Sequence, residues 1–543
     1  MRPIYCADSE TDPFYRGRFP KPFIWGLYSQ DDYVEFSEKD GDDFTDQFVK
    51  HVSQIDCVVY AHNGGKFDWF FILKHLDEFE PLMVIAGRLA KFKIGKAEFR
   101  DSYNILPIPL SAYQKDEIDY SIFEATERRK PQNWNAIRRY LKTDCQYLFE
   151  LVTGFIDNYG FNLTLAGAAL AQWRKIADQA TPKSSQHFYD QIKPYYYGGR
   201  VEAFAQGTFT RDFKVVDINS AYPWAMKKLH PYGTSFNESD TLPKSQGYIE
   251  RSFITLECIS KGALPFKGID SLEFPDDDIA RVYTITGWEY LAGLRTKTIG
   301  NIKIIKVITF TDSIGFDDYV DYFYDKKTLA KNADDRAEYI YSKLFLNSLY
   351  GKFASNPEKY KEYEVVRPSY IEAAEDNGFN FNGLIDKWAL MSRPLPEDKQ
   401  NYLNVAVSAS ITGCVRAYLF ESMQKCQGVL YCDTDSIMCE DIGALEIDPT
   451  TLGAWDIEAD CNFGAIGGKK LYAFKTLEGN WKTASKGARL TPDEIVKVCQ
   501  GVPVVYKPDN PSYSIKTGVS FVSRKIQKTT KNQKYLDFPK NAD

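Results

Sequence analysis

Two aspartates separated by a single residue constrain this sequence more than any other feature. Asp433 and Asp435 lie in the segment Tyr431-Cys-Asp-Thr-Asp-Ser436, which has apolar residues on both sides. Short apolar runs interrupted by a polar turn are typical of two strands joined by a hairpin. The chain has 74 acidic residues among 543, so such a pair arises often by chance. Taken alone, the pair is better explained as an ordinary turn or a calcium loop.

A third aspartate follows another apolar run. Asp217 ends a strand predicted over 213–217, in the block Val-Val-Asp-Ile-Asn-Ser-Ala-Tyr-Pro. Magnesium prefers carboxylates together with water and substrate phosphates. A strand end carrying Asp217 beside a hairpin carrying Asp433 and Asp435 can bring such carboxylates together. Two ions about 4 Å apart are the arrangement that nucleotidyl transfer requires.

A helix that carries a lysine favours a functional site over a chance pair. Lys343, Asn347 and Tyr350 lie at i, i+4 and i+7 of a helical pattern, so they share one face. A core helix does not normally place lysine and asparagine on one stripe, whereas such a face can bind phosphate and brace a nucleotide. Gly351 then allows another backbone or base to approach closely.

Composition and charge narrow the class of protein. A chain of 543 residues is expected to form about two to four domains. The net charge of −7 argues against a uniformly basic nucleic-acid binder, although phosphate binding needs only local basic strips. One such strip lies near the C-terminus, between residues 516 and 540, where Asp537 is the single acid. Its basic residues are Lys516, Arg524, Lys525, Lys528, Lys531, Lys534 and Lys540. Contact with DNA and a solvated tail explain this strip equally well.

Cysteine usage and hydropathy indicate an intracellular protein. The ten cysteines form no C-x-x-C pair and show no zinc spacing to the five histidines, so we expect reduced structural thiols. The N-terminus carries no signal-peptide core, and no apolar run approaches the length of a membrane span. We therefore expect a soluble protein with no membrane partner.

Hydrophobic periodicity predicts strands alternating with helices, which is typical of an α/β fold. The predicted strands span 58–61, 213–217, 302–308 and 429–432, and the predicted helices span 69–76, 134–152, 325–351 and 405–424. Residues 358–403 are polar and contain prolines, so they are predicted to be an insertion.

Four blocks, taken together and in this order, resemble the motifs of family B DNA polymerases. They are Asp217-Ile-Asn-Ser-Ala-Tyr-Pro223, Lys343-Leu-Phe-Leu-Asn-Ser-Leu-Tyr-Gly351, Tyr431-Cys-Asp-Thr-Asp-Ser436 and Lys470-Leu-Tyr472. The longer block from Asn347 to Pro357 is similar to the protein-primed branch found in phages with small linear genomes. The resemblance implies a right-hand polymerase with palm, fingers and thumb. It also implies two Mg²⁺ ions per active site, with Mn²⁺ as an alternative.

The resemblance implies a role for each matching residue. The expected metal ligands are Asp217, Asp435 and the carbonyl of Ile218, with Asp433 alongside as a further catalytic carboxylate. The expected nucleotide-binding residues are Tyr222, which would exclude a 2′-hydroxyl, Lys331, Lys343, Asn347 and Tyr350. The expected DNA-binding residues are Ser220, Ser348, Gly351, Thr412, Arg416, Lys470 and Tyr472. To these the resemblance adds a Y-x-G-G motif expected to couple two active sites: Tyr196, Gly198 and Gly199.

A second active site is implied in the N-terminal part. Its residues resemble a two-metal 3′–5′ exonuclease of RNase H-like fold, with carboxylates for metal and a tyrosine for the attacking water: Asp8, Glu10, Asp68, Asp144 and Tyr140. Lys115 matches the catalytic lysine of the family. Three residues match positions that hold a frayed single strand: Asn63, Phe67 and Ser102. The sequence departs from the family at Ser9, which replaces an aromatic or apolar residue, and at Tyr103, which replaces a leucine.

The resemblance also divides the chain. The expected segments are an exonuclease domain (1–185), a palm in two parts (186–228 and 406–500), a terminal-protein insertion (229–318), fingers (319–354), an insertion for processivity and strand displacement (355–405) and a thumb (501–543). The expected partners are a DNA primer–template, deoxynucleoside triphosphates and a terminal protein whose hydroxyl primes synthesis. The expected enzyme is a monomer that proofreads and acts in the cytoplasm of a bacterial host. Two alternatives stay open, namely a conventionally primed family B enzyme and a stand-alone nuclease or binding scaffold.

Overall fold

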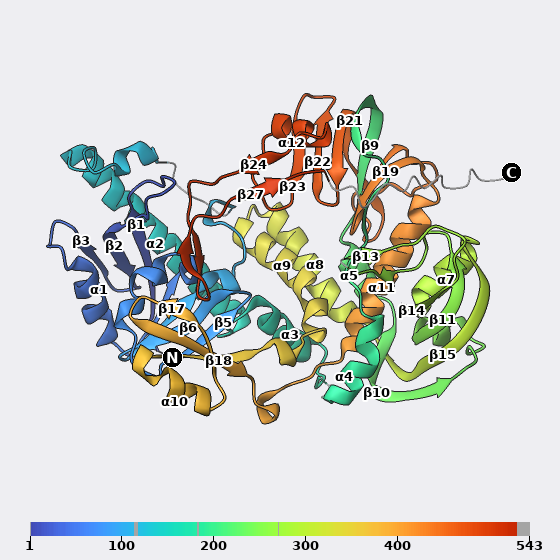
Figure 1. The fold of residues 1–543 in the computed structure, drawn as a ribbon, viewed down its shortest axis with the longest axis horizontal. Coiled ribbons are helices and arrows are strands. Elements are labelled where there is room, and N and C mark those ends of the chain that lie inside the picture. Colours follow the sequence, from blue (N-terminus) through green and yellow to red (C-terminus); the bar gives the residue numbers. More distant parts are fainter. Residues whose placement is uncertain (1, 113–117, 182–183, 270, 529–543) are drawn as a thin grey trace.

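The structure of the protein is a computed structural model that describes residues 2–112, 118–181, 184–269 and 271–528 (Figure 1). An N-terminal lobe lies at one end of the long axis, helices α8 and α9 lie in the middle, and a second sheet with its own insertion lies at the other end. All ten cysteines are buried free thiols. Among the described residues, no helix is long and apolar enough to cross a membrane.

A mixed sheet and three helices form the N-terminal lobe. Its strands lie in the order β5-β6-β7-β4-β1-β2-β3, with β4 parallel to both β1 and β7. The strands are β1 (Ile4–Thr11), β2 (Pro22–Tyr28), β3 (Tyr33–Ser37), β4 (Val58–Ala61), β5 (Pro81–Ile85), β6 (Arg88–Ile94) and β7 (Ala97–Asp101). The helices are α1 (Phe44–Ser53), α2 (Pro131–Tyr159) and α3 (Leu165–Ile176). The structure thus confirms the strand predicted over 58–61 and the helix predicted over 134–152.

The helix predicted over 69–76 is wrong. This part of the chain forms short 3₁₀ turns: η1 (Gly64–Lys66), η2 (Asp68–Phe71) and η3 (Leu73–His75). Asn63 precedes them with a left-handed φ of +63°. Trp69 is fully buried and packs edge-on against Phe92 and Phe99. Tertiary packing of bulky side chains therefore overrides the local helical pattern.

The segment predicted to be a polar insertion extends the N-terminal sheet. It contains β16 (Lys361–Val366), α10 (Ile371–Asp376), β17 (Asn380–Ile385) and β18 (Trp388–Pro394). Strand β16 pairs with β5, with Tyr363 opposite Leu82, so that ten strands form one sheet. Trp388 is buried in the same core and donates its indole N–H to the carbonyl of Leu73 at 3.2 Å. The insertion and the N-terminal lobe therefore share one hydrophobic core.

The helix predicted over 325–351 is in fact a pair of helices. These are α8 (Asp317–Asn332) and α9 (Arg336–Phe353). Asp334 has a φ of +55°, and the Asp335 side chain caps the start of α9. Aspartate favours such caps because its carboxylate binds backbone N–H groups that the helix leaves free. Phe345 of α9 packs 4.4 Å from Tyr159 of α2, which holds the pair against the N-terminal lobe.

An antiparallel sheet of seven strands lies beyond the helix pair. Its order is β23-β22-β21-β9-β20-β19-β8. The strands are β8 (Val201–Ala203), β9 (Gly207–Ile218), β19 (Gln427–Asp433), β20 (Ser436–Asp441), β21 (Trp455–Gly468), β22 (Leu471–Thr476) and β23 (Trp481–Ser485). The associated helices are α4 (Gln186–Ile192), α5 (Ala221–Met226), α11 (Val405–Met423) and α12 (Pro492–Cys499). The strands predicted over 213–217 and 429–432 and the helix predicted over 405–424 are confirmed.

The long segment between β9 and α8 forms its own sheet, in the order β10-β15-β11-β14. Its elements are β10 (His230–Ser239), α6 (Gln246–Glu250), β11 (Ser252–Ser260), β12 (Phe266–Lys267), β13 (Leu272–Glu273), β14 (Arg281–Thr286), α7 (Gly287–Arg295) and β15 (Ile299–Ile314). The strand predicted over 302–308 lies within β15.

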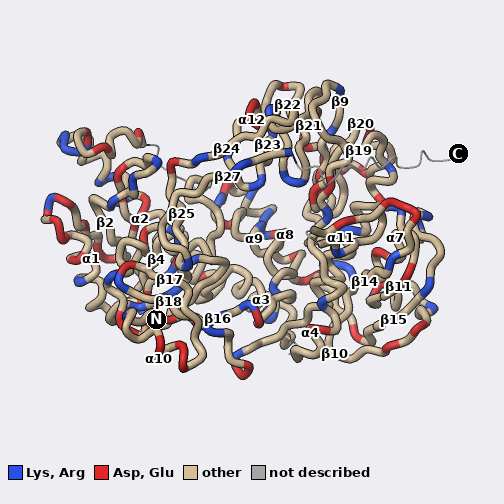
Figure 2. Tube along the Cα trace, viewed as in Figure 1, with Lys and Arg blue, Asp and Glu red and all other residues tan. Residues whose placement is uncertain are grey.

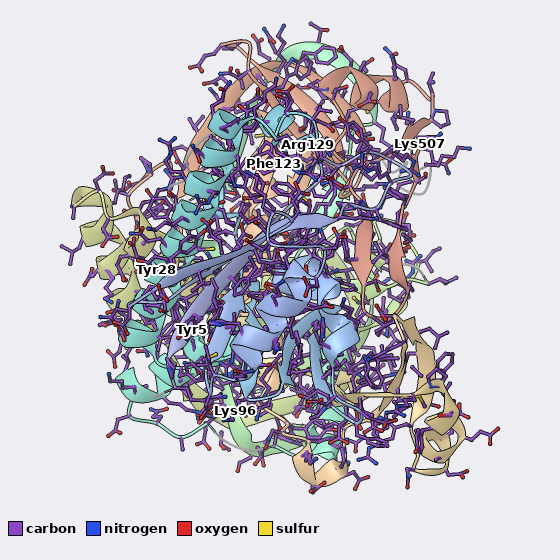
Figure 3. All side chains as sticks on the ribbon, turned by 90° about the vertical axis from the view of Figure 1, so that its left-hand side faces the viewer. Tyr5, Tyr28, Lys96, Phe123, Arg129 and Lys507 are labelled. Atoms are coloured by element: carbon purple, nitrogen blue, oxygen red, sulfur yellow. The ribbon has the colours of Figure 1, made fainter. Side chains whose placement is uncertain are left out.

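The C-terminal segment returns to the N-terminal lobe. It forms two small sheets, built from β24 (Val504–Tyr506) with β27 (Arg524–Ile526) and β25 (Ser512–Ser514) with β26 (Gly518–Ser520). Figure 3 views the molecule from the N-terminal lobe and labels Lys507 on this segment, at the opposite side of the view from Tyr28. Part of the basic strip, together with Asp537, lies outside the described residues: Lys531, Lys534 and Lys540. Figure 2 shows acidic and basic residues interspersed over all lobes, as the modest net charge leads one to expect.

Candidate active sites

The two aspartates of the hairpin lie at its turn, between β19 and β20. The backbone N–H of Asp435 donates to the carbonyl of Asp433 at 2.6 Å, and Thr434 between them has a φ of +63°. Strand β20 pairs with β9 so that Ser436 lies opposite Asp217, and the N–H of Ile218 donates to the carbonyl of Asp435 at 2.8 Å. The strand pairing therefore brings Asp217 and Asp435 to one edge, as predicted.

These carboxyl groups lie in a partly buried cavity of about 340 Å³, where charge is costly. Burial, followed by repulsion from Asp435, raises the pKa of Asp217 to about 8. Burial, followed by repulsion from Asp433, raises the pKa of Asp435 to about 6. Cations would relieve both the burial penalty and the repulsion. The polar lining of the cavity therefore suits divalent ions.

Two acids that the sequence did not single out line the same cavity. Asp456 lies opposite Asp217 in the pairing of β21 with β9, and Glu458 follows two residues later. Glu458 also pairs with Lys482 at 2.8 Å. Residues two apart on a strand share one face, so Asp456 and Glu458 could have been predicted here if the pairing of β21 with β9 had been known.

The donor set fits magnesium only when substrate completes it. Within the described ranges, no three His, Cys, Asp or Glu side chains converge closely enough to hold an ion alone. Magnesium ordinarily keeps several waters and binds one or two carboxylates together with substrate phosphates. Asp217, Asp435 and the carbonyl of Ile218 match this pattern. Asp433 instead pairs with Lys470 in this structure.

A lysine-rich face lies across the cavity from the carboxylates. Lys343 and Asn347 of α9 are exposed and line it, as predicted for nucleotide-binding residues. Lys327 of α8 also lines it, and burial together with repulsion from Lys343 and Lys331 lowers the pKa of Lys327. Lys331, one helical turn further on, lies outside the lining of the cavity. Lys327 was not predicted, although it lies four residues before Lys331 on the same helix face and that spacing could have indicated it.

Two tyrosines predicted to bind nucleotide form one stacked pair. The rings of Tyr222 and Tyr350 lie 4.2 Å apart and within 6° of parallel. Ser220 lines the cavity and precedes Tyr222 with a φ of +55°. Ser348 donates to the carbonyl of its own helix at Leu344. Neither ring lines the cavity, and burial, with a smaller effect of Asp435, raises the pKa of both hydroxyls. The pair therefore lies near Asp435 but outside the cavity lining.

The Y-x-G-G turn packs directly on the catalytic hairpin. A Cβ atom on Gly199 would lie 2.8 Å from the side chain of Thr434, so only glycine allows this approach. The carbonyl of the next residue, Arg200, accepts the N–H of Thr434 at 2.6 Å. Tyr196 is half-buried and Gly198 is exposed beside this turn. At Gly351, by contrast, a Cβ would meet no described atom within 4 Å outside its own helix, so the chain itself does not crowd that glycine.

The structure buries Thr412 and Arg416, whose contacts with DNA stay a prediction. Both side chains lie within α11 and its neighbours, each about 2% exposed. Arg416 pairs with Glu289 of the first insertion at 2.8 Å and donates to the carbonyls of Tyr197 and Gly198. In this structure Arg416 therefore contacts the Y-x-G-G turn.

The Lys470 and Tyr472 pair lies beside the hairpin, and its contact with DNA stays a prediction. Lys470 contacts Asp433, and its backbone N–H donates to the hydroxyl of Tyr431 at 2.8 Å. The ring of Tyr472 packs 5.2 Å from that of Tyr431. Both residues are thus placed next to the catalytic turn.

The second site forms where β1 meets α2. Asp8 and Glu10 lie two residues apart on β1, and Tyr140 and Asp144 lie one turn apart on α2. Burial, a hydrogen bond with Tyr120 and repulsion from Asp144 and Glu10 raise the pKa of the Tyr140 hydroxyl. The structure therefore brings these predicted residues together, whereas Lys115 lies outside the described residues.

Asp68 is held on the other side of the same strand. The Ser9 hydroxyl donates to the Asp68 carboxylate at 2.6 Å. Burial raises the pKa of Asp68 to about 7, and hydrogen bonds to Ser9 oppose this shift. A serine at this position, where the family has an apolar or aromatic side chain, thus gives Asp68 a direct hydrogen-bond donor.

The three predicted single-strand residues lie in the same lobe, where Ser102 is fully buried. The Ser102 hydroxyl lies 3.0 Å from His62 Nδ1, and Asn63 accepts a hydrogen bond from Arg88. The ring of Phe67 packs 5.3 Å from that of Tyr513 in the C-terminal segment. Sequence reasoning missed Arg88 and Tyr513, because neither belongs to a motif.

Comparison with known proteins shows the family of the chain. The family model for type B DNA polymerases of organelles and viruses matches residues 107–378. The DNA-directed DNA polymerase of Enterobacteria phage PRD1 is 37% identical over 97% of this chain and 98% of its own. The DNA polymerase of Bacillus phage phi29 is 24% identical over 84% of each chain.

The fold matches as well. The structure of phi29 DNA polymerase complexed with primer-template DNA covers 97% of this chain and 100% of its own, with a TM-score of 0.73 at 19% identity. This likeness confirms the predicted multidomain α/β fold. This chain therefore belongs to the type B DNA polymerases of organelles and viruses and is a DNA-directed DNA polymerase.

Proposed function

We propose that this DNA polymerase extends a primer on a DNA template by two-metal nucleotidyl transfer with Mg²⁺. The observation that carries the proposal is one cavity that joins Asp217 and Asp435 on one side to Lys327 and Lys343 on the other. Bound ions would activate the primer hydroxyl and neutralise the leaving pyrophosphate. Phi29 DNA polymerase complexed with primer-template DNA and incoming nucleotide substrates has the same fold, with a TM-score of 0.72, which supports these classes of substrate.

The chain's own residues bind and orient the nucleotide. The carboxylates and the lysines face each other across the cavity, so a triphosphate placed between them meets positive charge on the side away from the acids. The stacked Tyr222 and Tyr350 would form a flat surface against which the sugar and base lie. Tyr222 would exclude a 2′-hydroxyl and so select deoxyribonucleotides, as the resemblance to the family implies.

Lys327 is expected to bind the triphosphate more strongly than Lys331. The Lys327→Ala variant should raise the KM for deoxynucleotide by roughly 10-fold, because it removes a partly buried, charge-assisted contact. Primer extension at varied nucleotide concentration measures this effect. Lys331→Ala on the same helix is the matched control and should change KM less. A larger effect at Lys331 would contradict the assignment.

Binding of Mg²⁺ is expected to strengthen as pH rises. The raised pKa of Asp217 means that its folded, metal-free form keeps a proton up to about pH 8. This carboxyl therefore destabilises the metal-free fold progressively from about pH 4 to pH 8, since its unfolded pKa is near 3.9. Mg²⁺ should raise the melting temperature more at pH 8.5 than at pH 6, as measured by thermal unfolding. Asp217→Asn should abolish most of this difference, whereas equal Mg²⁺ effects at both pH values would contradict the prediction.

We further propose that the N-terminal lobe is a 3′–5′ exonuclease that proofreads. Support comes from the joint placement of Asp8, Glu10, Tyr140 and Asp144 where β1 meets α2. These carboxylates would hold two divalent ions, and the Tyr140 hydroxyl would orient the attacking water. Release of nucleotides from a mismatched primer end, lost in Asp8→Ala, tests the proposal.

Protein priming is the remaining part of the proposed function. The two insertions, 229–318 and 355–405, support it, because they lie where the protein-primed branch that the sequence resembles carries its insertions. The purified chain would be incubated with Mg²⁺, one labelled deoxynucleotide and each small protein encoded beside it on its genome. A labelled protein that survives SDS, absent with Asp435→Ala, establishes priming by a terminal protein inside the host cell. Label incorporated only with an oligonucleotide primer supports the conventionally primed alternative.

A further inference from the structure

An arginine outside all the motifs joins three segments of the proposed exonuclease site. Arg88 begins β6 and is 15% exposed at its side chain. Its guanidinium donates to Asn63 Oδ1 at 2.7 Å and to Asp101 Oδ2 at 2.9 Å. The same group lies over the ring of Tyr103, 4.1 Å from its centroid. Arg88 therefore contacts the turn after β4 and the end of β7 at once.

The contact with Asn63 fixes which way the amide faces. A guanidinium has five donors and no acceptor, so the Asn63 atom that faces it must be the oxygen. The Asn63 NH₂ group is then turned away from Arg88 and is left as a donor. An amide that could otherwise rotate by 180° is thereby committed to one orientation.

We propose that Arg88 is a positioning residue that aims the Asn63 amide N–H at an acceptor oxygen of the single-stranded 3′ end. This inference rests on the proposed exonuclease function and adds a residue to it. Arg88 acts by orientation rather than by free charge, because Asp101 neutralises it. Asp101 is fully buried at its side chain and accepts the N–H of Tyr103, so the anchor is itself fixed.

Tyr103 supplies the platform for the guanidinium. This position departs from the family's leucine, and an aromatic face attracts a guanidinium where a leucine does not. Tyr103 is also 5.7 Å from His62, which contacts Ser102. The aromatic substitution and the arginine thus form one unit at the strand-binding surface.

The variants follow from these contacts. Arg88→Lys keeps a charge against buried Asp101, which limits misfolding. It loses the planar guanidinium that lies over Tyr103 and thereby holds Nη1 between Asn63 and Asp101. Asn63 has a left-handed φ, so Asn63→Gly removes its side chain without backbone strain. Asn63→Asp keeps an acceptor for Arg88 and removes the donor.

The test measures degradation of a single-stranded oligonucleotide and, separately, its binding in metal-free buffer by fluorescence anisotropy. We expect Arg88→Lys, Asn63→Gly and Asn63→Asp each to raise KM and Kd by roughly 10-fold, with kcat within about 2-fold. The double variant Arg88→Lys/Asn63→Gly should be no worse than Asn63→Gly alone, because both act through one contact. Primer extension at wild-type rates verifies folding of each variant.

Two results would overturn the inference. Multiplicative losses in the double variant would mean that Arg88 contacts the strand by itself, and an unchanged Kd in Arg88→Lys would mean that it does nothing for binding. A third result would separate the two proposals. If the wild-type chain degraded no DNA, but bound the oligonucleotide more tightly than Arg88→Lys, the exonuclease proposal would be refuted and the role of Arg88 in binding would stand.

Discussion

Asp435→Ala is expected to abolish DNA synthesis while leaving 3′–5′ degradation intact. Asp435 faces Asp217 at the edge where β20 pairs with β9, and both line the cavity that Lys343 enters. Alanine removes one of the few carboxylates available to two ions, and a neighbouring residue cannot reach the same place from a fixed hairpin. The rate of primer extension should fall by at least about 10³-fold, more than the roughly 10–100-fold typical for losing an outer partner of a metal ligand.

Asp8→Ala is the matched control, with the opposite expected result. Asp8 belongs to β1 in the N-terminal lobe, remote along the chain from the hairpin. Its loss should end degradation and spare extension. Asp435→Asn, which keeps the size of the side chain, separates loss of charge from loss of packing. If either alanine variant lost both activities with an unchanged melting temperature, the assignment of two separate sites would be wrong.

The sequence predicted those parts of the sites that depend on local pattern. An apolar–polar–apolar run predicted the hairpin of Asp433 and Asp435, and helical spacing placed Lys343 and Asn347 on one face. Both predictions depend on neighbours within a few residues, where strand and helix periods act directly. The partner acid Asp456 depends instead on which strand lies beside β9, and no local pattern states that.

Burial was harder to predict than secondary structure. Arg416 matched a DNA-contact motif, yet it lies in the interior because Glu289, 127 residues earlier, pairs with it there. A buried arginine is tolerated only when such a partner and backbone carbonyls satisfy it. The partner comes from an insertion without any readable motif. Sequence spacing therefore identified the residue but not the side of the helix that would face solvent.

The polar composition of the second insertion gave no sign of its packing. Residues 358–403 were predicted only to be an insertion, and the structure adds that β16 and β18 place buried side chains in a sheet that continues from the edge strand β5. An unpaired sheet edge favours the addition of a strand. Because the pairing joins Tyr363 to Leu82, which are far apart in the sequence, only the folded chain shows it.

This shared core leads to the second large effect, which we expect for Trp388→Ala. Trp388 belongs to the insertion and is 4% exposed, and its indole N–H donates to Leu73 in the N-terminal lobe. Truncation leaves a cavity and an unsatisfied carbonyl, for which losses of about 3–5 kcal/mol in the free energy of unfolding are typical. The N-terminal lobe should therefore unfold at lower denaturant concentration, although the substituted residue lies outside it.

Leu384→Ala separates a shared core from a general effect of the insertion. Leu384 lies in the same insertion but is 59% exposed, so its truncation should change stability by less than about 0.5 kcal/mol. Exonuclease activity during denaturant titration reports the N-terminal lobe, and primer extension reports the polymerase site. If the insertion were an independent arm, Trp388→Ala would leave the midpoint for exonuclease activity unchanged. If Trp388→Ala shifts that midpoint and Leu384→Ala does not, the insertion and the lobe unfold together.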